Sequence, residues 1–125
     1  MELQKVATDK APAAIGPYSQ AVIVNDIVYT SGQIPVDPET GLVVGDDIVS
    51  QAERVCQNLF AVLEASGSSF DNVIKTTCFL QDMADFAQFN AVYEKYFISK
   101  PARSCVAVKT LPKNVLVEIE VIAKI

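Results

Sequence analysis

Four residues near the C-terminus have side chains that can act together on a small carboxylate substrate. They are Arg103, Cys105, Glu118 and Glu120. An arginine guanidinium is suited to bidentate binding of a carboxylate, and a nearby glutamate can hold and activate a water molecule. A thiol beside an arginine can serve as a nucleophile, because the cation lowers its pKa. The segment therefore indicates a small-molecule site.

These residues fall on two predicted strands, about residues 103–109 and 115–123, with a turn around 112–114 between them. Side chains alternate between the two faces of a strand, and apolar residues favour apolar neighbours. A shift by one residue would bury a glutamate in the hydrophobic layer, which is costly. The pairs expected across this hairpin are Val106 with Val117, Cys105 with Glu118, and Arg103 with Glu120.

A structural role is the alternative for each of these groups. Arg103 and Glu120 are also what a solvent-exposed cross-strand ion pair looks like, and such pairs are common. With no base nearby, we favour Cys105 as a small packed residue rather than a nucleophile. Cys56, on a predicted helix face, and Cys78, in a predicted strand, are expected in the core.

The chain contains no histidine. This excludes Ser-His-Asp and Cys-His nucleophile pairs, imidazole bases and histidine metal sites. The three cysteines are widely spaced and form no C-x-x-C motif, so we expect reduced thiols and no metal.

Weaker candidates lie elsewhere in the chain. Gly16-Pro17-Tyr18-Ser19 precedes a strand, and Thr30-Ser31-Gly32 ends one, where a glycine lets a ligand approach the backbone. A turn glycine is the simpler interpretation of both. Asn90 is either a helix-surface residue or a ligand contact. Gly41 and Gly45 are not followed by G-K-[ST], so a phosphate-binding loop is unsupported.

The elements that must position these residues follow from periodicity. Residues 21–24 and 27–30 predict a hairpin around Asn25-Asp26, and a loop follows at 35–41. Apolar spacings of three and four predict a helix from Asp46 to Gly67 and a second from about Ala84 to Phe97. A strand at 73–80 separates them. The order β-β-α-β-α-β-β predicts an α+β two-layer domain, a mixed sheet with both helices on one face.

Two helices on one face leave the other face of the sheet uncovered. The last strand is apolar in both alternation classes, with Val117 and Ile119 in one class and Leu116 and Ile122 in the other. An exposed apolar sheet face predicts association, so we expect a homo-oligomer.

Composition limits the remaining function classes. The 125 residues are 50% hydrophobic with a net charge of −5, which fits one domain over residues 1–125 and disfavours nucleic-acid binding. No apolar run approaches a membrane span, and residues 1–16 do not resemble a signal peptide. We therefore expect a cytoplasmic protein.

Three motifs in order resemble the RidA family, also called the YjgF/YER057c/UK114 family. The first is Ala11-Pro-Ala-Ala-Ile-Gly-Pro-Tyr-Ser-Gln20, and the second is Tyr29-Thr-Ser-Gly-Gln-Ile-Pro35. The third combines Pro101-Ala-Arg-Ser-Cys-Val106 with Leu111-Pro112 and Val117-Glu-Ile-Glu120. Asn58-Leu59 agrees as well, and the resemblance runs from about Thr8 to the C-terminus. Because Arg103 is present, the chain is similar to the reactive enamine/imine deaminase subgroup.

The resemblance implies a chorismate-mutase-like fold assembled as a homotrimer with three clefts between subunits. It implies hydrolysis of 2-iminobutanoate and 2-iminopropanoate to 2-keto acids and ammonia, with no cofactor and no metal. Arg103 is expected to bind the substrate carboxylate and Glu118 to position water. Glu120 is expected to be structural or to pack in the trimer. The residues expected to line the cleft are Tyr18, Ser31, Gly32, Asn90 and Cys105.

Three other functions remain open. An endoribonuclease or translation inhibitor is an activity attributed to some relatives, but the acidic charge and the lack of histidine argue against it. A non-catalytic regulatory trimer that binds small keto acids would use the same Arg103 cleft. A holdase would rely on surface lysines and exposed apolar area instead.

Overall fold

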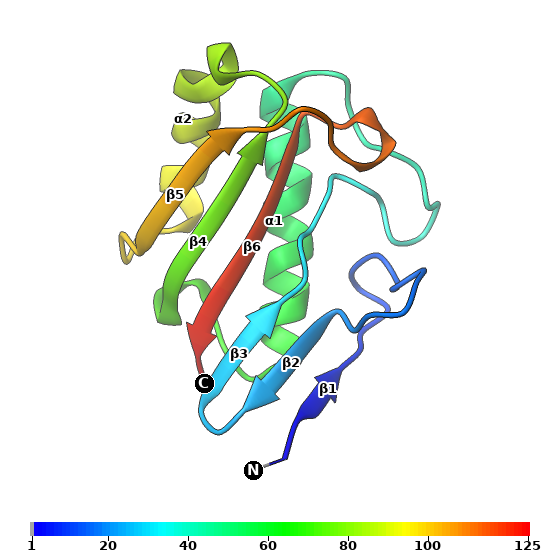
Figure 1. Cartoon of the computed structure of the whole chain (residues 1–125), viewed down its shortest axis with the longest axis vertical. Coiled ribbons are helices and arrows are strands. Elements are labelled where there is room, and N and C mark those ends of the chain that lie inside the picture. Colours follow the sequence, from blue (N-terminus) through cyan, green and yellow to red (C-terminus); the bar gives the residue numbers. More distant parts are fainter. Residues whose placement is uncertain (1) are drawn as a thin grey trace.

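The sheet and its two helices form two layers in the computed structural model, which describes residues 2–125. Six strands form one mixed sheet in the order β1-β2-β3-β6-β4-β5, and α1 and α2 lie behind the same face of it (Figure 1). The predicted α+β two-layer architecture is confirmed. The elements are β1 Gln4–Val6, β2 Ala21–Val24, β3 Ile27–Thr30, α1 Ile48–Ala65, β4 Val73–Leu80, α2 Phe86–Tyr96, β5 Ala102–Ala107 and β6 Val117–Lys124.

The β2–β3 hairpin forms as predicted. Ala21 pairs with Thr30 and Val24 with Ile27. Asn25 takes a positive φ of 53° in the turn, a conformation that asparagine tolerates better than most residues. Strand β1 is not predicted by the sequence, because the three residues Gln4–Val6 are too few to show an alternation and form a strand only by pairing with β2.

Helix α1 supplies more core residues than any other element and has clear signals at both ends. The Asp47 side chain accepts a hydrogen bond from Ser50 N at 2.8 Å, which caps the N-terminus. After the last turn, Gly67 adopts a φ of 80°, and Ser68 N bonds the Leu63 carbonyl at 2.8 Å. The helix predicted between Asp46 and Gly67 is therefore confirmed as Ile48–Ala65.

Helix α2 begins slightly later than predicted. Asp82 accepts a hydrogen bond from Ala84 N at 2.8 Å and caps a separate short turn, Met83–Asp85, before α2 starts at Phe86. Phe89 and Tyr93 are buried against the sheet, as the apolar spacing predicts. Cys56 and Cys78 are also buried in the core, as expected.

The predicted C-terminal hairpin is wrong, because β4 lies between β5 and β6 (Figure 1). Cys78 of β4 pairs with Cys105 on one side and Ile119 on the other. The β5–β6 connection passes over the end of β4, where Val108 N bonds the Leu80 carbonyl and Gln81 N bonds the Leu116 carbonyl. The cross-strand pairs that the sequence predicted, Val106 with Val117, Cys105 with Glu118 and Arg103 with Glu120, therefore do not form.

The sheet face opposite the helices is covered by no element among residues 2–125. Tyr29, Ile74 and Val106 on this outer face are 45%, 47% and 47% exposed. Side chains of β2 and β6 on the same face, such as Val22 and Ile122, are half-buried. The expected uncovered apolar face is thus confirmed, and association through it remains a prediction.

Asn58 ties α1 to the loop that follows β3. Its side chain is fully buried, and its Nδ2 donates to the carbonyls of Ile34 and Val36, each at 3.0 Å. Its Oδ1 accepts from Arg54 Nη2 at 2.7 Å. The asparagine therefore fixes the loop that begins at Gly32.

We expect Asn58→Ala to destabilise the fold by about 2–4 kcal/mol, because two backbone carbonyls then lose their donor inside the protein. Urea unfolding followed by circular dichroism measures this free energy. Gln57→Ala, at the exposed neighbouring position of the same helix, is the control and should change it by less than about 0.5 kcal/mol. Equal effects of the two substitutions would contradict the role of Asn58.

Candidate functional site

The predicted site residues divide into two groups on opposite faces of the sheet. Arg103 pairs with Thr76, and Cys105 pairs with Cys78; both partners are buried on the helix side. Glu118 pairs instead with Phe79, on the outer face. The prediction that Arg103, Cys105 and Glu118 share one face is therefore wrong.

The separation follows from the strand order. Strands β5 and β6 lie two positions apart, which at about 4.8 Å per strand places their backbones about 10 Å apart. Their reactive side chains then point in opposite directions. A single chain does not bring the Arg103 guanidinium to the Glu118 carboxylate.

The first group surrounds Arg103 at the edge of the sheet. The half-buried guanidinium donates from Nη1 to Asn90 Oδ1 at 2.7 Å. Its Cζ lies 4.7 Å from the centre of the Tyr93 ring and 5.4 Å from that of Phe86. The one ion pair among residues 2–125 joins Lys95 and Glu53, so no carboxylate within this range neutralises Arg103. Asn90, which the resemblance places in the cleft, thus lies beside Arg103, and its contact with a ligand remains a prediction.

A groove lies beside this arginine on the helix side. Its volume is about 370 Å³. It is lined by Asn90, Tyr93, Glu94, Phe97, Lys100, Pro101 and Arg103. A ligand in this groove meets the guanidinium directly, and the unneutralised cation favours an anionic group there.

Cys105 is half-buried next to Arg103, but it is poorly suited to nucleophilic attack. Burial raises the pKa of its thiol, and this effect exceeds the opposing influence of the Arg103 cation. The thiol therefore stays protonated near neutral pH, which favours the packed role over the nucleophile.

The backbone of β5 adds hydrogen-bond donors to the first group. Val108 N bonds the Leu80 carbonyl at 2.9 Å. Because alternate residues of a parallel strand bond to the same neighbour, the N–H groups of Arg103 and Cys105 point to the free edge of β5. The Cys105 N–H is thus a free donor close to the Arg103 side chain.

The second group lies where β3 ends beside β6. Ser31 Oγ donates to the Ser19 carbonyl at 2.6 Å, which holds the segment containing Tyr18 against β3. Gln33 and Ile119 exchange two backbone hydrogen bonds, which fixes Gly32 beside Glu118. Gly32 and Glu118 therefore lie side by side within a single chain.

Gly32 is required here for space rather than for its backbone conformation. A Cβ atom at this position would lie 2.0 Å from Glu118 Oε2. The glycine therefore leaves room for the carboxylate, and a side chain there would push the carboxylate away.

We expect Gly32→Ala to leave the fold intact and to lower kcat/KM for the reaction proposed below by about tenfold or more, because it displaces the Glu118 carboxylate. Steady-state kinetics would measure this loss. In the Glu118→Gln background, the same Gly32→Ala substitution should cost little more, since both changes disable one group. Fully additive effects would show that Gly32 acts independently of Glu118.

Glu118 has an unusual protonation equilibrium. Burial raises the pKa of its carboxyl above the ordinary value of 4.5, and the nearby Glu120 carboxylate raises it further. Glu120 is itself exposed on the outer face. The two glutamates therefore place negative charge on an uncovered surface that is otherwise apolar.

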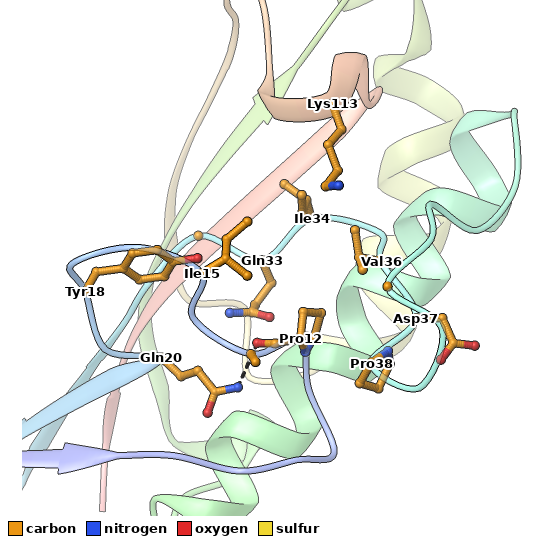
Figure 2. Close-up of a pocket in the computed structure, with 13 residues that line it drawn as sticks. Pro12, Ile15, Tyr18, Gln20, Gln33, Ile34, Val36, Asp37, Pro38 and Lys113 are labelled. Atoms are coloured by element: carbon orange, nitrogen blue, oxygen red, sulfur yellow. Dashed lines mark hydrogen bonds between the residues drawn. The ribbon is translucent and has the colours of Figure 1, made fainter.

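A cavity of about 230 Å³ opens beside this second group (Figure 2). Tyr18 and Gly32 line it, as do several residues that the sequence analysis did not select. In Figure 2 the Lys113 side chain extends from the β5–β6 connection toward Ile34, and Ile15 lies near Tyr18. These residues come from separate loops without periodicity, so only the tertiary structure brings them together.

Residues 2–125 contain no group of three or more cysteine, aspartate or glutamate side chains placed to hold a metal ion. No helix of this part of the chain is both long enough and apolar enough to cross a bilayer.

Comparison with known proteins gives consistent matches along the chain. The family model described as endoribonuclease L-PSP matches residues 8–125. A Lactococcus lactis protein named putative regulator AldR is 57% identical, with 96% of each chain covered. The Salmonella typhimurium 2-iminobutanoate/2-iminopropanoate deaminase is 51% identical, with 94% of each covered. The crystal structure of E. coli TdcF with bound serine has a TM-score of 0.93 at 44% identity, covering 98% of each chain.

Proposed function

Because the chain belongs to the endoribonuclease L-PSP family, which includes RidA and YjgF, we propose that it hydrolyses reactive 2-imino acids. The substrates are 2-iminobutanoate and 2-iminopropanoate, and the products are the 2-keto acid and ammonia. The deaminase relative from Salmonella typhimurium supports this choice of reaction. The observation that carries it is the Arg103 guanidinium, which is held beside a groove without a carboxylate partner among residues 2–125.

The site is completed between two copies of the chain. One copy supplies Arg103, Asn90 and the Cys105 N–H, and the second supplies Glu118 with Tyr18, Ser31 and Gly32. The opposite orientation of Arg103 and Glu118 in one chain supports this arrangement. The uncovered apolar sheet face supplies a surface for association, and a homotrimer with three such sites satisfies both observations.

In the proposed reaction Arg103 binds the substrate carboxylate through two parallel N–H···O bonds. This fixes the adjacent iminium carbon, which is already electrophilic, so positioning supplies much of the rate enhancement. Glu118 accepts a hydrogen bond from the attacking water and takes its proton. A C–O bond forms while the C=N π electrons move to nitrogen.

The resulting carbinolamine then breaks down. The nitrogen receives the proton held by Glu118, and the C–N bond cleaves to release ammonia. As the hydroxyl becomes the keto oxygen, it gives its proton to Glu118, which passes it to ammonia to form ammonium. Water and the iminium are consumed, and the keto acid and ammonium are formed, so no oxidant or cofactor is needed. The bound serine in the E. coli TdcF crystal structure shows that a relative accommodates a small molecule with a carboxylate and a nitrogen next to it.

The decisive assay generates 2-iminobutanoate with a threonine dehydratase in the presence of semicarbazide, which traps the imine. We expect the protein to suppress semicarbazone formation while 2-oxobutanoate accumulates faster. Unchanged semicarbazone formation in the presence of the assembled protein would overturn the proposed activity.

The pH dependence of the activity follows from Glu118. A carboxyl with a raised pKa is still protonated at pH values where an ordinary glutamate is ionised, and a protonated carboxyl cannot accept the proton of water. As the pH is lowered, we therefore expect activity to start falling before pH 4.5 is reached. The free energy of unfolding changes in the opposite direction. The folded state binds the Glu118 proton more tightly than the unfolded state does, so the contribution of Glu118 to stability declines as pH rises through the raised pKa.

Glu118→Gln tests both effects. We expect it to reduce kcat while carboxylate ligands still bind, and to increase Tm relative to the parent at pH 7 but not below pH 4. Activity profiles and thermal unfolding across this range measure these changes. An unchanged rate and acid limb in the variant would remove Glu118 from the reaction.

A regulatory role is the second candidate, because a relative at 57% identity is named a putative regulator. The same Arg103 groove would bind a small keto or amino acid without turnover. Binding of 2-oxobutanoate without suppression of semicarbazone formation would favour this function. Endoribonuclease activity is less compatible with the net charge of −5.

A further inference from the structure

Aromatic rings form the support on which the Arg103 guanidinium rests. Tyr93 lies 4.7 Å from the guanidinium carbon and Phe86 lies 5.4 Å away, both measured to the ring centre. With Asn90, these residues recur every three or four positions along α2, so one stripe of the helix faces the arginine. A cation at these distances is attracted by the electron-rich face of the ring.

Every group that holds Arg103 within residues 2–125 is electrically neutral. Asn90 accepts one of its hydrogen bonds, and the rings contribute through their faces. A carboxylate partner would also fix the side chain, but it would compete with a ligand carboxylate for the same N–H groups. The neutral support restricts the guanidinium and leaves its charge and its remaining donors available.

The Tyr93 ring is itself firmly held. Its hydroxyl lies 2.8 Å from Thr76 Oγ1, and both residues are buried. Two other rings contact the Tyr93 ring. Phe97 stacks on it with ring centres 4.2 Å apart and an interplanar angle of 21°, and the ring centre of Phe89 lies 5.7 Å away. The ring face that Arg103 contacts is therefore fixed by the core.

We propose that Tyr93, assisted by Phe86, is a positioning residue that orients Arg103 for a ligand carboxylate without neutralising it. The inference rests on the proposed role of Arg103 as the carboxylate-binding group. It assigns the aromatic stripe of α2 a role in binding as well as in the core.

The test changes the electron density of the ring at nearly constant shape. In the assembled protein, position 93 is replaced by phenylalanine and then by phenylalanines with increasing ring fluorination, and calorimetry gives the Kd of 2-oxobutanoate. Tyr93→Phe should change Kd by less than about threefold, because the ring face is retained. Fluorination should then weaken binding step by step, reaching about tenfold for the trifluorinated ring.

Phe89 provides the matched control, because it is buried on the same helix and contacts Tyr93 but does not lie over Arg103. The same fluorination at Phe89 should leave Kd unchanged, and at Phe86 it should give a smaller trend than at Tyr93. If the most fluorinated Tyr93 chains do not fold, the Phe86 series decides the outcome.

The possible outcomes separate the two proposals. A flat fluorination series, or equal trends at Tyr93 and Phe89, together with loss of binding in Arg103→Ala, would overturn the positioning role and leave the carboxylate-binding role intact. Unchanged 2-oxobutanoate binding in Arg103→Ala would overturn both. A graded trend confined to Tyr93 and Phe86 would support the inference.

Discussion

An Arg103→Ala variant should remain folded and lose imine hydrolysis, so that semicarbazone forms as fast in its presence as without protein. Among residues 2–125 the half-buried guanidinium makes one side-chain hydrogen bond, so its removal should perturb the fold little. Losing a bidentate, charge-assisted pair with the substrate costs about 3 kcal/mol or more, which corresponds to at least about a hundredfold in kcat/KM. The trapping assay and 2-oxobutanoate calorimetry measure the two losses.

The chain contains one other arginine, which provides a matched control. Arg54 contacts Asn58 on α1 and belongs to neither group of the site. Arg54→Ala should keep its activity, whereas Arg103→Lys should recover only part of the parent rate, because an ammonium lacks the planar pair of donors. Full activity in Arg103→Ala, with the assembly intact, would exclude the proposed mechanism.

Two impaired variants should recover activity when they assemble together. In chains carrying Arg103→Ala, the Glu118 group is intact, and in chains carrying Glu118→Gln, the Arg103 group is intact. Where an Arg103 from one chain meets a Glu118 from another, a mixed assembly contains a complete site. In a cyclic trimer each mixed assembly contains one complete site out of three, so the mixed assemblies should show about a third of the parent's specific activity.

This experiment requires the subunits to exchange, which co-expression with two different affinity tags ensures. The doubly tagged fraction is purified and compared with each variant alone. A control that mixes Arg103→Ala with the double variant Arg103→Ala/Glu118→Gln contains no intact Arg103 and should stay inactive. No recovery in the doubly tagged fraction would contradict a site shared between chains.

The individual elements of the fold could be predicted because their signals are local. Asp47 and Gly67 mark the ends of α1, and Asn25 marks the β2–β3 turn. The predicted alternation of the last two strands is also correct within each strand. Short-range periodicity determines which face a side chain occupies, and no distant residue is needed to read it.

The neighbours of a strand could not be predicted in the same way. We paired β5 with β6 because consecutive strands usually pair, and because Val106 and Val117 are both apolar. In the structure Val106 lies on the uncovered face, which is itself apolar, while Val117 lies in the core. Because both faces of the sheet are apolar, matching apolar residues across strands does not distinguish one register from another. The sequence therefore does not predict that β4 lies between β5 and β6.

The same ambiguity in strand order explains why the site could be predicted only in part. The residue types were informative, since Arg103 with Asn90, and Gly32 with Glu118, are neighbours in the structure. The division of these pairs between two faces depends on the strand order. The aromatic support from Tyr93 was predicted only as core, because helical periodicity does not distinguish a packed ring from one that also contacts a cation.

In the proposed mechanism, the opposite orientation of Arg103 and Glu118 makes catalysis a property of the assembly rather than of the single chain. The core between the two helices and the inner sheet face is built from residues of one chain, so we expect each copy to fold around it. On dilution below the dissociation constant of the proposed assembly, we therefore expect turnover to be lost while the secondary structure persists. The activity of such a protein in a cell would then depend on its concentration in two ways. More chains give more sites, and a higher concentration also raises the fraction of chains that are associated.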